Sequence, residues 1–307
     1  MPVCERDPWR LQFFAGIPCP DGINIPTDDP DAWEWFPEHR WVYDKLRIAV
    51  SQGIACGPHG VMPARFPVFS KPMMNLKGMG IGSRVLADAA EADHAYAPGH
   101  MWMELLDGAH VSSDCAIAEG RLVWLRHATG AAWHEGTFKH WTIHARFDSG
   151  LDDYLGSWIS RHMAGYTGMM NFETIGGRII EAHLRFADQW CDLYGKGWVE
   201  ALIQLYATGR WRFVDDDRRD GFSIPLFVRH GANQRHPTAA AQALIRAMDH
   251  VTSLQITFHE GKDAARHPMP PGGFRVGIVN ATDLAAGQRA RAELARSFPP
   301  DDVILPD

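Results

Sequence analysis

The sequence predicts an α+β protein made of closely joined lobes, and two observations carry this prediction. Apolar runs of strand length alternate with stretches whose apolar residues recur every three or four positions, which is typical of strands and amphipathic helices in one chain. The 307 residues are 46% hydrophobic and 22% charged. That composition belongs to ordinary globular proteins and excludes a disordered or fibrous chain.

Composition also limits the partners that we expect. With 30 Lys and Arg against 37 Asp and Glu, the net charge of −7 argues against a general nucleic-acid binder. The five cysteines contain no CxxC pair and predict neither a disulfide framework nor a zinc ribbon. The N-terminal stretch does not resemble a signal peptide, and no run reaches the ~18 apolar residues of a spanning helix. We therefore expect a reduced, cytoplasmic protein that binds no membrane.

The first third of the chain alternates irregular and regular segments. Residues 1–40 are rich in Pro, Asp and Trp and predict irregular connections with short strands. Residues 41–53 place their apolar side chains on one face of a helix. Residues 66–72 predict a buried strand, a glycine-rich turn follows, and 84–93 predict a helix. Residues 101–106 predict a further apolar strand.

The rest of the chain predicts two hairpins and an α/β tail. Residues 111–128 favour a hairpin that turns at Glu119–Gly120, whereas 128–147 lack a clean period and predict a loop or lid. The clearest hairpin is 169–186, whose turn contains Gly176–Gly177. Toward the C-terminus we expect a strand, a helix, two strands and a final helix. Further helices are predicted at 151–163 and at about 190–207.

Lysines and glycines gather after the strand at 66–72. Lys71 ends this strand, and the residues that follow include Lys77, Gly78, Gly80 and Gly82. Glycines allow backbone N–H groups to close over a phosphate, and a lysine supplies a point charge. The spacing matches neither a Walker A loop nor a dinucleotide fingerprint. Two interpretations stay open at this point, a phosphate-binding loop and a surface loop with solvated lysines.

Charged residues also alternate along the hairpin 169–186. Glu181, His183 and Arg185 share one face of the returning strand, and the glycine turn would place Glu173 opposite Glu181. Two opposed carboxylates repel unless a cation lies between them, which favours a metal site. Arg185 could then hold a transferred phosphoryl group. The alternative is a solvated polar face of an antiparallel sheet.

These constellations, in this order, resemble the ATP-grasp superfamily over about residues 41–186. The resemblance implies an ATP-grasp fold, in which two α+β lobes hold ATP between them, with an additional C-terminal α/β segment. The stretch YDKLRIAVSQGI resembles the family's "DK" helix and implies that Lys45 reaches the ATP phosphates. The stretch FPVFSKPMMNLKGMGIGSR is similar to the strand ending in "KP" and its glycine loop. It implies that Lys71 is the second ATP lysine and that Lys77 and Gly78–Gly82 cover the phosphates.

Two further motifs carry the resemblance. MWMELLDGAHVSSD is similar to the family's hinge strand, which implies that Glu104 and the backbone of Leu105 and Leu106 bind adenine and that His110 lies near the ribose. The hairpin is similar to the closing acidic and E-x-N elements, which implies that Glu173 and Glu181 bind Mg²⁺. His183 stands where the family usually has Asn, so it is either a softer metal ligand or a neighbour of the metal.

The resemblance implies an ADP-forming, ATP-dependent ligase that joins a small-molecule carboxylate to an amine or related nucleophile through an acyl phosphate. ATP and Mg²⁺ are the implied cofactors, with Mn²⁺ as an alternative metal, and Lys71 and Arg185 are the implied catalytic residues. A small-molecule kinase on the same fold, a nucleotide-binding protein without catalysis, and a homodimeric assembly stay open. Four segments are expected: an N-terminal segment with the DK helix (1–60), a small lobe (61–106), a large lobe (107–221) and a C-terminal segment (222–307).

Overall fold

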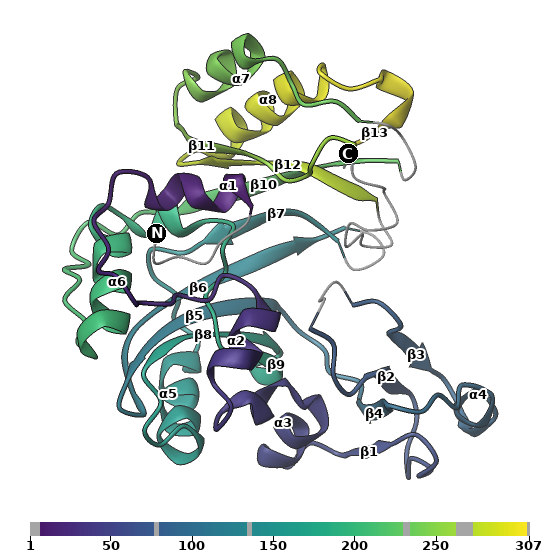
Figure 1. Cartoon of the computed structure of the whole chain (residues 1–307). Coiled ribbons are helices and arrows are strands. Elements are labelled where there is room, and N and C mark those ends of the chain that lie inside the picture. Colours follow the sequence, from purple (N-terminus) through teal and green to yellow (C-terminus); the bar gives the residue numbers. More distant parts are fainter. Residues whose placement is uncertain (1–6, 77–79, 134–136, 230–233, 262–272, 306–307) are drawn as a thin grey trace. The chain divides into compact units, whose positions relative to one another are not determined.

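The computed structural model describes residues 7–76, 80–133, 137–229, 234–261 and 273–305 (Figure 1). The chain divides into two compact units. Unit 1 consists of 1–27, 126–148 and 187–307, and unit 2 consists of 28–125 and 149–186. One strand, β6 (Arg121–Ala132), begins in unit 2 and ends in unit 1. The predicted division into four segments is finer than this one and stays a prediction.

Unit 2 begins with short helices, and the first of them lies where irregular connections with short strands were predicted. They are α2 (Asp29–Trp35), a 3-10 turn (Arg40–Tyr43) and α3 (Lys45–Ser51). The helix predicted at 41–53 is split because Asp44 has an extended backbone and caps α3, accepting hydrogen bonds from the N–H groups of Leu46 and Arg47 at 3.0 and 3.2 Å. The prediction of strands in this region was wrong because prolines and capping aspartates fit the first turn of a helix as well as a loop.

The small sheet of unit 2 is antiparallel with the strand order β1-β4-β2-β3. Buried Met101 and Met103 of β4 pack with Ala49 of α3 beneath it. The helix predicted at 84–93 is instead strand β3 followed by helix α4, because Asp88 caps a new helix by accepting from the N–H of Glu91 at 2.9 Å. The elements are β1 (Cys56–Pro58), β2 (Val68–Pro72), β3 (Arg84–Leu86), α4 (Ala89–His94) and β4 (His100–Glu104).

The larger sheet region of unit 2 contains β5 (His110–Ala118), β8 (Gly168–Ile175) and β9 (Arg178–His183), with β8 antiparallel to both neighbours. Gly176 and Gly177 join β8 to β9 with φ of +56° and +77°, as the predicted hairpin requires. A Cβ atom at Gly176 would collide with the carbonyl oxygen of Asp107. Only glycine therefore fits this turn without strain.

One face of β8 carries the apolar core of this sheet. Helix α5 (Leu151–His162) buries Trp158, and its ring lies 5.4 Å from that of Phe172, centroid to centroid. Because side chains alternate across a strand, the neighbours Asn171 and Glu173 face the other way. The apolar face anchors the strand and leaves the opposite face available for polar residues.

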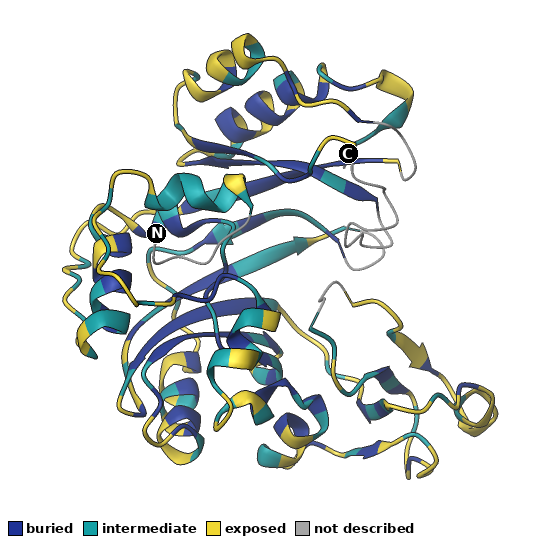
Figure 2. Ribbon diagram, viewed as in Figure 1, coloured by how far each residue is buried: buried dark blue, intermediate teal, exposed yellow. Residues whose placement is uncertain are grey.

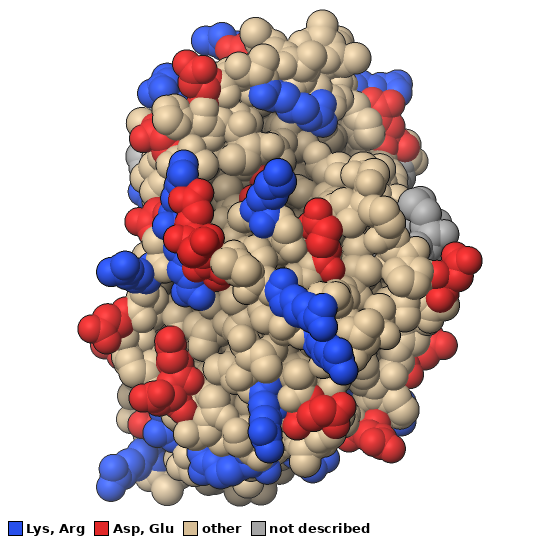
Figure 3. Space-filling view, turned by 90° about the vertical axis from the view of Figure 1, so that its left-hand side faces the viewer, with Lys and Arg blue, Asp and Glu red and all other residues tan. Residues whose placement is uncertain are grey.

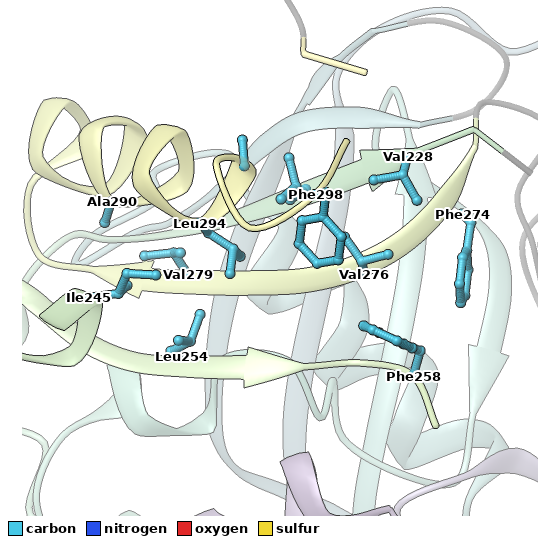
Figure 4. Packing of buried hydrophobic residues seen from close by; sticks show 12 residues of the cluster. Val228, Ile245, Leu254, Phe258, Phe274, Val276, Val279, Ala290, Leu294 and Phe298 are labelled. Carbon is cyan, nitrogen blue, oxygen red and sulfur yellow. The ribbon is translucent and has the colours of Figure 1, made fainter. Parts of the chain in front are cut away.

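Unit 1 combines a sheet of order β11-β12-β10-β7-β6, with β13 beside β10, and four helices among its described residues. Buried Leu226, Val276, Val279 and Leu294 belong to its core cluster (Figure 4). The elements are α1 (Pro8–Leu11), β7 (Phe138–Ile143), α6 (Trp198–Thr208), β10 (Gly221–Val228), α7 (Ala239–Arg246), β11 (Val251–Ile256), β12 (Phe274–Ala281), α8 (Leu284–Ala295) and β13 (Val303–Ile304).

The predicted order of elements in the tail is confirmed, whereas the loop predicted at 128–147 is wrong. Within that stretch β6 continues to Ala132 and pairs with β7, which begins at Phe138. The sequence of this stretch shows no alternation of apolar and polar residues, because β6 and β7 both bury small or aromatic side chains here, Ala128 and Trp141 among them.

Burial follows the sheets and the inner helix faces, while the outward helix faces are exposed (Figure 2). On the face drawn in Figure 3, Lys and Arg side chains lie interspersed with Asp and Glu side chains, so no field of a single sign covers it. Within the described ranges, no helix combines the length and the apolar character that crossing a bilayer requires.

Candidate active site

A cluster of polar side chains occupies one face of strands β5, β8 and β9, and we call it the polar face. The register places Glu173 directly opposite Glu181, which confirms the predicted proximity of these two carboxylates, and it places Asn171 opposite His183. Strand β5 adds the next row, with Ser112 opposite Glu173. The polar face is formed by His110, Ser112, Asp114, Asn171, Glu173, Glu181 and His183.

Two buried lysines reach this hairpin from other elements of unit 2. The ammonium of Lys45, at the start of α3, lies 2.8 Å from Oε1 of Glu181. The ammonium of Lys71, on β2, donates to the carbonyl oxygen of Ile180 at 2.8 Å. Helix α3 is held there by Gln52, whose side-chain amide exchanges two hydrogen bonds of 2.8 Å with the backbone of Ile179. The structure thus brings together two lysines that are 26 positions apart in the sequence.

Lys71 is 2% exposed, and burial lowers the pKa of its ammonium to about 8 although nearby Glu181 acts in the opposite direction. Lys45, 7% exposed, adds a second positive charge that also lowers the pKa of Lys71. Two ammonium groups so close together repel each other unless anions offset them. The pair is therefore suited to bind a group with several negative charges, such as a polyphosphate.

His110 and Glu173 form an ion pair at the start of the polar face, with 3.1 Å between Nε2 and Oε2. Burial opposes the charged forms of both groups. The hydrogen bond and the charge of His110 nevertheless hold the pKa of Glu173 well below its usual range, and Glu173 in turn raises the pKa of His110. Glu173 is therefore kept as a carboxylate, and the charged form of His110 is favoured.

Asp29, at the start of α2, organises the far end of the polar face. Its carboxylate accepts from Nε of Arg185 at 2.8 Å, from Nδ1 of His183 at 3.1 Å and from the hydroxyl of Tyr43 at 3.2 Å. Asp29 is 4% exposed, and although burial raises its pKa, the charges of Arg185 and His183 outweigh burial and lower it. Asp29 fixes the orientation of both side chains, as a buried carboxylate does when its partners satisfy it.

A second buried group supports the middle of the polar face. The side-chain amide of Asn171 donates to Oγ of Ser112 at 2.8 Å and to Oδ1 of Asp114 at 2.7 Å. All three side chains are buried. The sequence prediction did not include Ser112, Asp114, Asp29 or Tyr43. A signal existed only for the first two, since Ser112 and Asp114 are two positions apart on β5 and therefore share the face that pairs with the hairpin.

The residues predicted to bind adenine lie at the C-terminal end of β4, an inner strand of the small sheet. Glu104 ends β4, and its N–H donates to the carbonyl oxygen of Ala55 at 2.8 Å. Leu105 is 40% exposed, and Leu106 packs against the cluster that contains Met103.

Part of the predicted glycine loop lies within the described ranges. Gly80 and Gly82 have φ of +61° and +81°, conformations that favour glycine. Lys77 and Gly78 lie outside the described residues. The roles predicted for all these positions stay predictions.

The polar face has the donor set for a hard divalent cation. No group of three or more His, Cys, Asp and Glu residues in the described part of the chain is arranged to hold a metal by itself. Mg²⁺, however, is commonly bound by one or two carboxylates together with substrate phosphates, rather than by an all-protein cage. The opposed carboxylates of Glu173 and Glu181 fit that mode of binding.

No family model and no curated protein matches the sequence. Solved structures do match. The L-amino acid ligase of Bacillus licheniformis superposes with a TM-score of 0.62 at 12% identity, covering 97% of this chain and 84% of its own. The phosphoribosylamine–glycine ligase of Thermotoga maritima superposes with a TM-score of 0.59 at 14% identity, and the match covers 93% of this chain and 85% of the ligase. The carboxyaminoimidazole ribonucleotide synthase of Aspergillus clavatus, solved with ATP, superposes with a TM-score of 0.60 at 11% identity. This match covers 90% of this chain and 76% of the synthase.

These structures are ATP-grasp enzymes, and their similarity extends over nearly the whole chain. The chain therefore has the ATP-grasp fold, and the fold that the sequence resemblance implied is confirmed.

Proposed function

We propose that the protein is an ATP-dependent, ADP-forming ligase that joins a small-molecule carboxylate to an amine or related nucleophile. One observation carries the proposal: two buried lysines, Lys45 and Lys71, converge on the hairpin whose strands oppose Glu173 and Glu181. The shared fold supports it, since two of the similar structures are ligases that form a bond to an amino acid or amine and a third holds ATP.

The lysines and carboxylates would divide the binding of Mg²⁺–ATP between them. Lys71 offers its ammonium to the phosphates, and Lys45 exchanges its contact with Glu181 for phosphate oxygens. Glu173 and Glu181 would hold Mg²⁺, which when bound neutralises charge on the phosphates during transfer. His110 keeps Glu173 ionised and oriented for this task. Glu104, Leu105 and Leu106 are proposed to bind adenine, and Gly78–Gly82 to cover the phosphates.

Arg185 would act at the transferred group. Asp29 holds its guanidinium through Nε at 2.8 Å and Nη2 at 3.1 Å. A further contact, from Nη1 to the carbonyl oxygen of Phe186 at 3.1 Å, fixes the guanidinium more firmly, so its positive charge is held in one orientation for a phosphoryl group. The carboxylate substrate attacks the γ-phosphorus, ADP leaves, and an acyl phosphate forms. The amine then attacks the acyl carbon, phosphate leaves with the electron pair of the broken C–O bond, and the amine loses a proton.

Product analysis tests the proposal. The protein is incubated with Mg²⁺, ATP and a mixture of amino acids and metabolites, and nucleotide and organic products are identified by mass spectrometry. ADP, free phosphate and a new amide or related adduct are expected. ADP with a phosphorylated metabolite would instead establish a kinase on this fold, AMP with pyrophosphate would contradict the proposed chemistry, and absence of turnover would favour a nucleotide-binding protein.

A matched pair of variants shows whether turnover depends on the polar face. Glu181→Gln removes a carboxylate that contacts Lys45, so turnover is expected to be lost. Glu34→Gln makes the same chemical change at an exposed position of α2 and is expected to leave turnover unchanged. Equal activity of both variants would contradict the assignment of Glu181.

A further inference from the structure

One buried nitrogen on the polar face has no hydrogen-bond partner among the residues that the structure describes. His183 is 4% exposed, and its Nδ1 lies 3.1 Å from each carboxylate oxygen of Asp29. Its Nε2 is buried without a hydrogen-bond partner and lies 3.7 Å from Oε2 of Glu181, too far for a hydrogen bond. The ring is therefore held firmly on one side while its other nitrogen faces a carboxylate of the candidate metal site.

The partners of the ring indicate which nitrogen carries the proton. The oxygens of a carboxylate only accept hydrogen bonds, and Asp29 also accepts from Arg185 and Tyr43, so Nδ1 of His183 donates to it. In the neutral ring this leaves a lone pair on Nε2. A carboxylate on one ring nitrogen and a free lone pair on the other is the arrangement that orients histidine as a metal ligand.

We infer that His183 contributes an imidazole nitrogen to the metal that Glu181 binds, and that the site consequently prefers a first-row transition cation of the Mn²⁺ or Co²⁺ class over Mg²⁺. Imidazole is a softer ligand than an amide or carboxylate oxygen, and affinity for nitrogen ligands rises from Mn²⁺ to Co²⁺. Two protein ligands are enough if phosphate oxygens complete the shell. The inference rests on the proposed function, because the phosphates of a bound nucleotide provide those oxygens.

Spectroscopy of the wild-type protein tests the inference directly. Mn²⁺ and ADP are added, and electron spin echo envelope modulation is recorded to detect coupling of the manganese to a ¹⁴N nucleus of imidazole. Coupling is expected. If Mn²⁺–ADP binds without such coupling, the inference is overturned and the proposed function survives. If Mn²⁺–ADP does not bind, both the inference and the proposed function are overturned.

Variants extend the test to selectivity. The dissociation constants of Co²⁺ and Mg²⁺ are measured by calorimetry in the presence of ADP. In His183→Asn the preference for Co²⁺ over Mg²⁺ is expected to fall about tenfold, comparable to the loss caused by disturbing a metal-bound histidine. Tyr43→Phe is the control, since it removes another hydrogen bond to Asp29 and leaves the imidazole in place. An unchanged preference in His183→Asn, or an equal fall in Tyr43→Phe, would overturn the inference.

Discussion

The two units bury opposite kinds of surface on antiparallel strands. In unit 1, strands β10 and β12 bury Leu226, Val276 and Val279 in an apolar core (Figure 4). In unit 2, the polar face instead buries polar side chains such as Asp114 and Asn171, and the side chains of Glu173 and Glu181 are 32% and 18% exposed. An apolar face is stabilised by burial itself, whereas buried charges lower stability unless partners offset them.

The contacts of the polar face show how the loss of stability from buried charges is offset. Asp29 receives three donors, Glu173 pairs with His110, and Glu181 pairs with Lys45. Lys71 donates to the neutral carbonyl group of Ile180, and burial lowers its pKa to about 8. A face maintained at this cost is expected to serve binding or catalysis, while the core of unit 1 serves stability.

The largest expected effect tests the apolar side of the comparison. Leu294 of α8 is fully buried in the core of unit 1. Leu294→Ala is expected to lower the free energy of unfolding by about 2–5 kcal/mol, because a cavity is left in place of the side chain. Leu244→Ala on α7 is the control, since its side chain is 58% exposed and its loss should cost less than about 0.5 kcal/mol. Urea denaturation measures both, and similar losses would contradict the description of this core.

The second prediction tests the polar side. Lys71→Ala removes one charge-assisted contact to phosphate, so the affinity for ATP is expected to weaken by roughly 1.5–3 kcal/mol without unfolding the chain. Lys196→Ala, at an exposed position of unit 1, is the control. Calorimetric titration with ATP measures the affinity, and equal values for the two variants would refute the role of Lys71.

The hairpin was predictable and the network around Asp29 was not, for a physical reason. A glycine pair at a turn and the two-residue period of a strand are local properties, so Glu173 could be placed near Glu181 from the sequence. Their direct opposition depends on a register shift between Glu173 and Thr174, which these properties do not predict. Asp29 contacts Arg185 across 156 positions. No local pattern links the two, and Pro30 and Asp31 beside it indicate only a helix start.

The fold was predicted from the order of the motifs along the chain and not from any single motif. The Lys71 strand and the hairpin that carries Glu173 were each open to a second interpretation, and only their sequence of occurrence resembled ATP-grasp enzymes. The extension of β6 to Ala132 could not be predicted, because Gly130 lies in a strand and closely approaches the ring of Phe138. From the sequence alone, such a strand glycine cannot be distinguished from a glycine in a loop.

The smallest expected effect concerns the pH dependence of the ion pair between His110 and Glu173. The pKa of His110 is raised above its ordinary 6.5, so its contribution to stability is complete below that value and is lost as the pH rises through the raised pKa. The pKa of Glu173 is lowered from 4.5, so its contribution is lost only as the solution becomes strongly acidic.

We therefore expect His110→Asn to lower the thermal midpoint more at about pH 6 than at about pH 9. His94→Asn, at an exposed position of α4, is the control and should show little change at either pH. Thermal denaturation followed by circular dichroism gives the midpoints. A deficit in His110→Asn that stays constant or grows with pH would contradict the ion pair.

The most direct test of the account is the dependence of ATP binding on Mg²⁺ in the wild-type protein and in Glu181→Gln. Each protein is titrated with ATP by calorimetry, once with Mg²⁺ and once with a chelator. If Glu181 helps to hold the metal against the phosphates, Mg²⁺ should strengthen ATP binding in the wild type, and this gain should shrink or vanish in Glu181→Gln while metal-free binding is largely retained. The same gain in both proteins, or no ATP binding in either, would contradict the account.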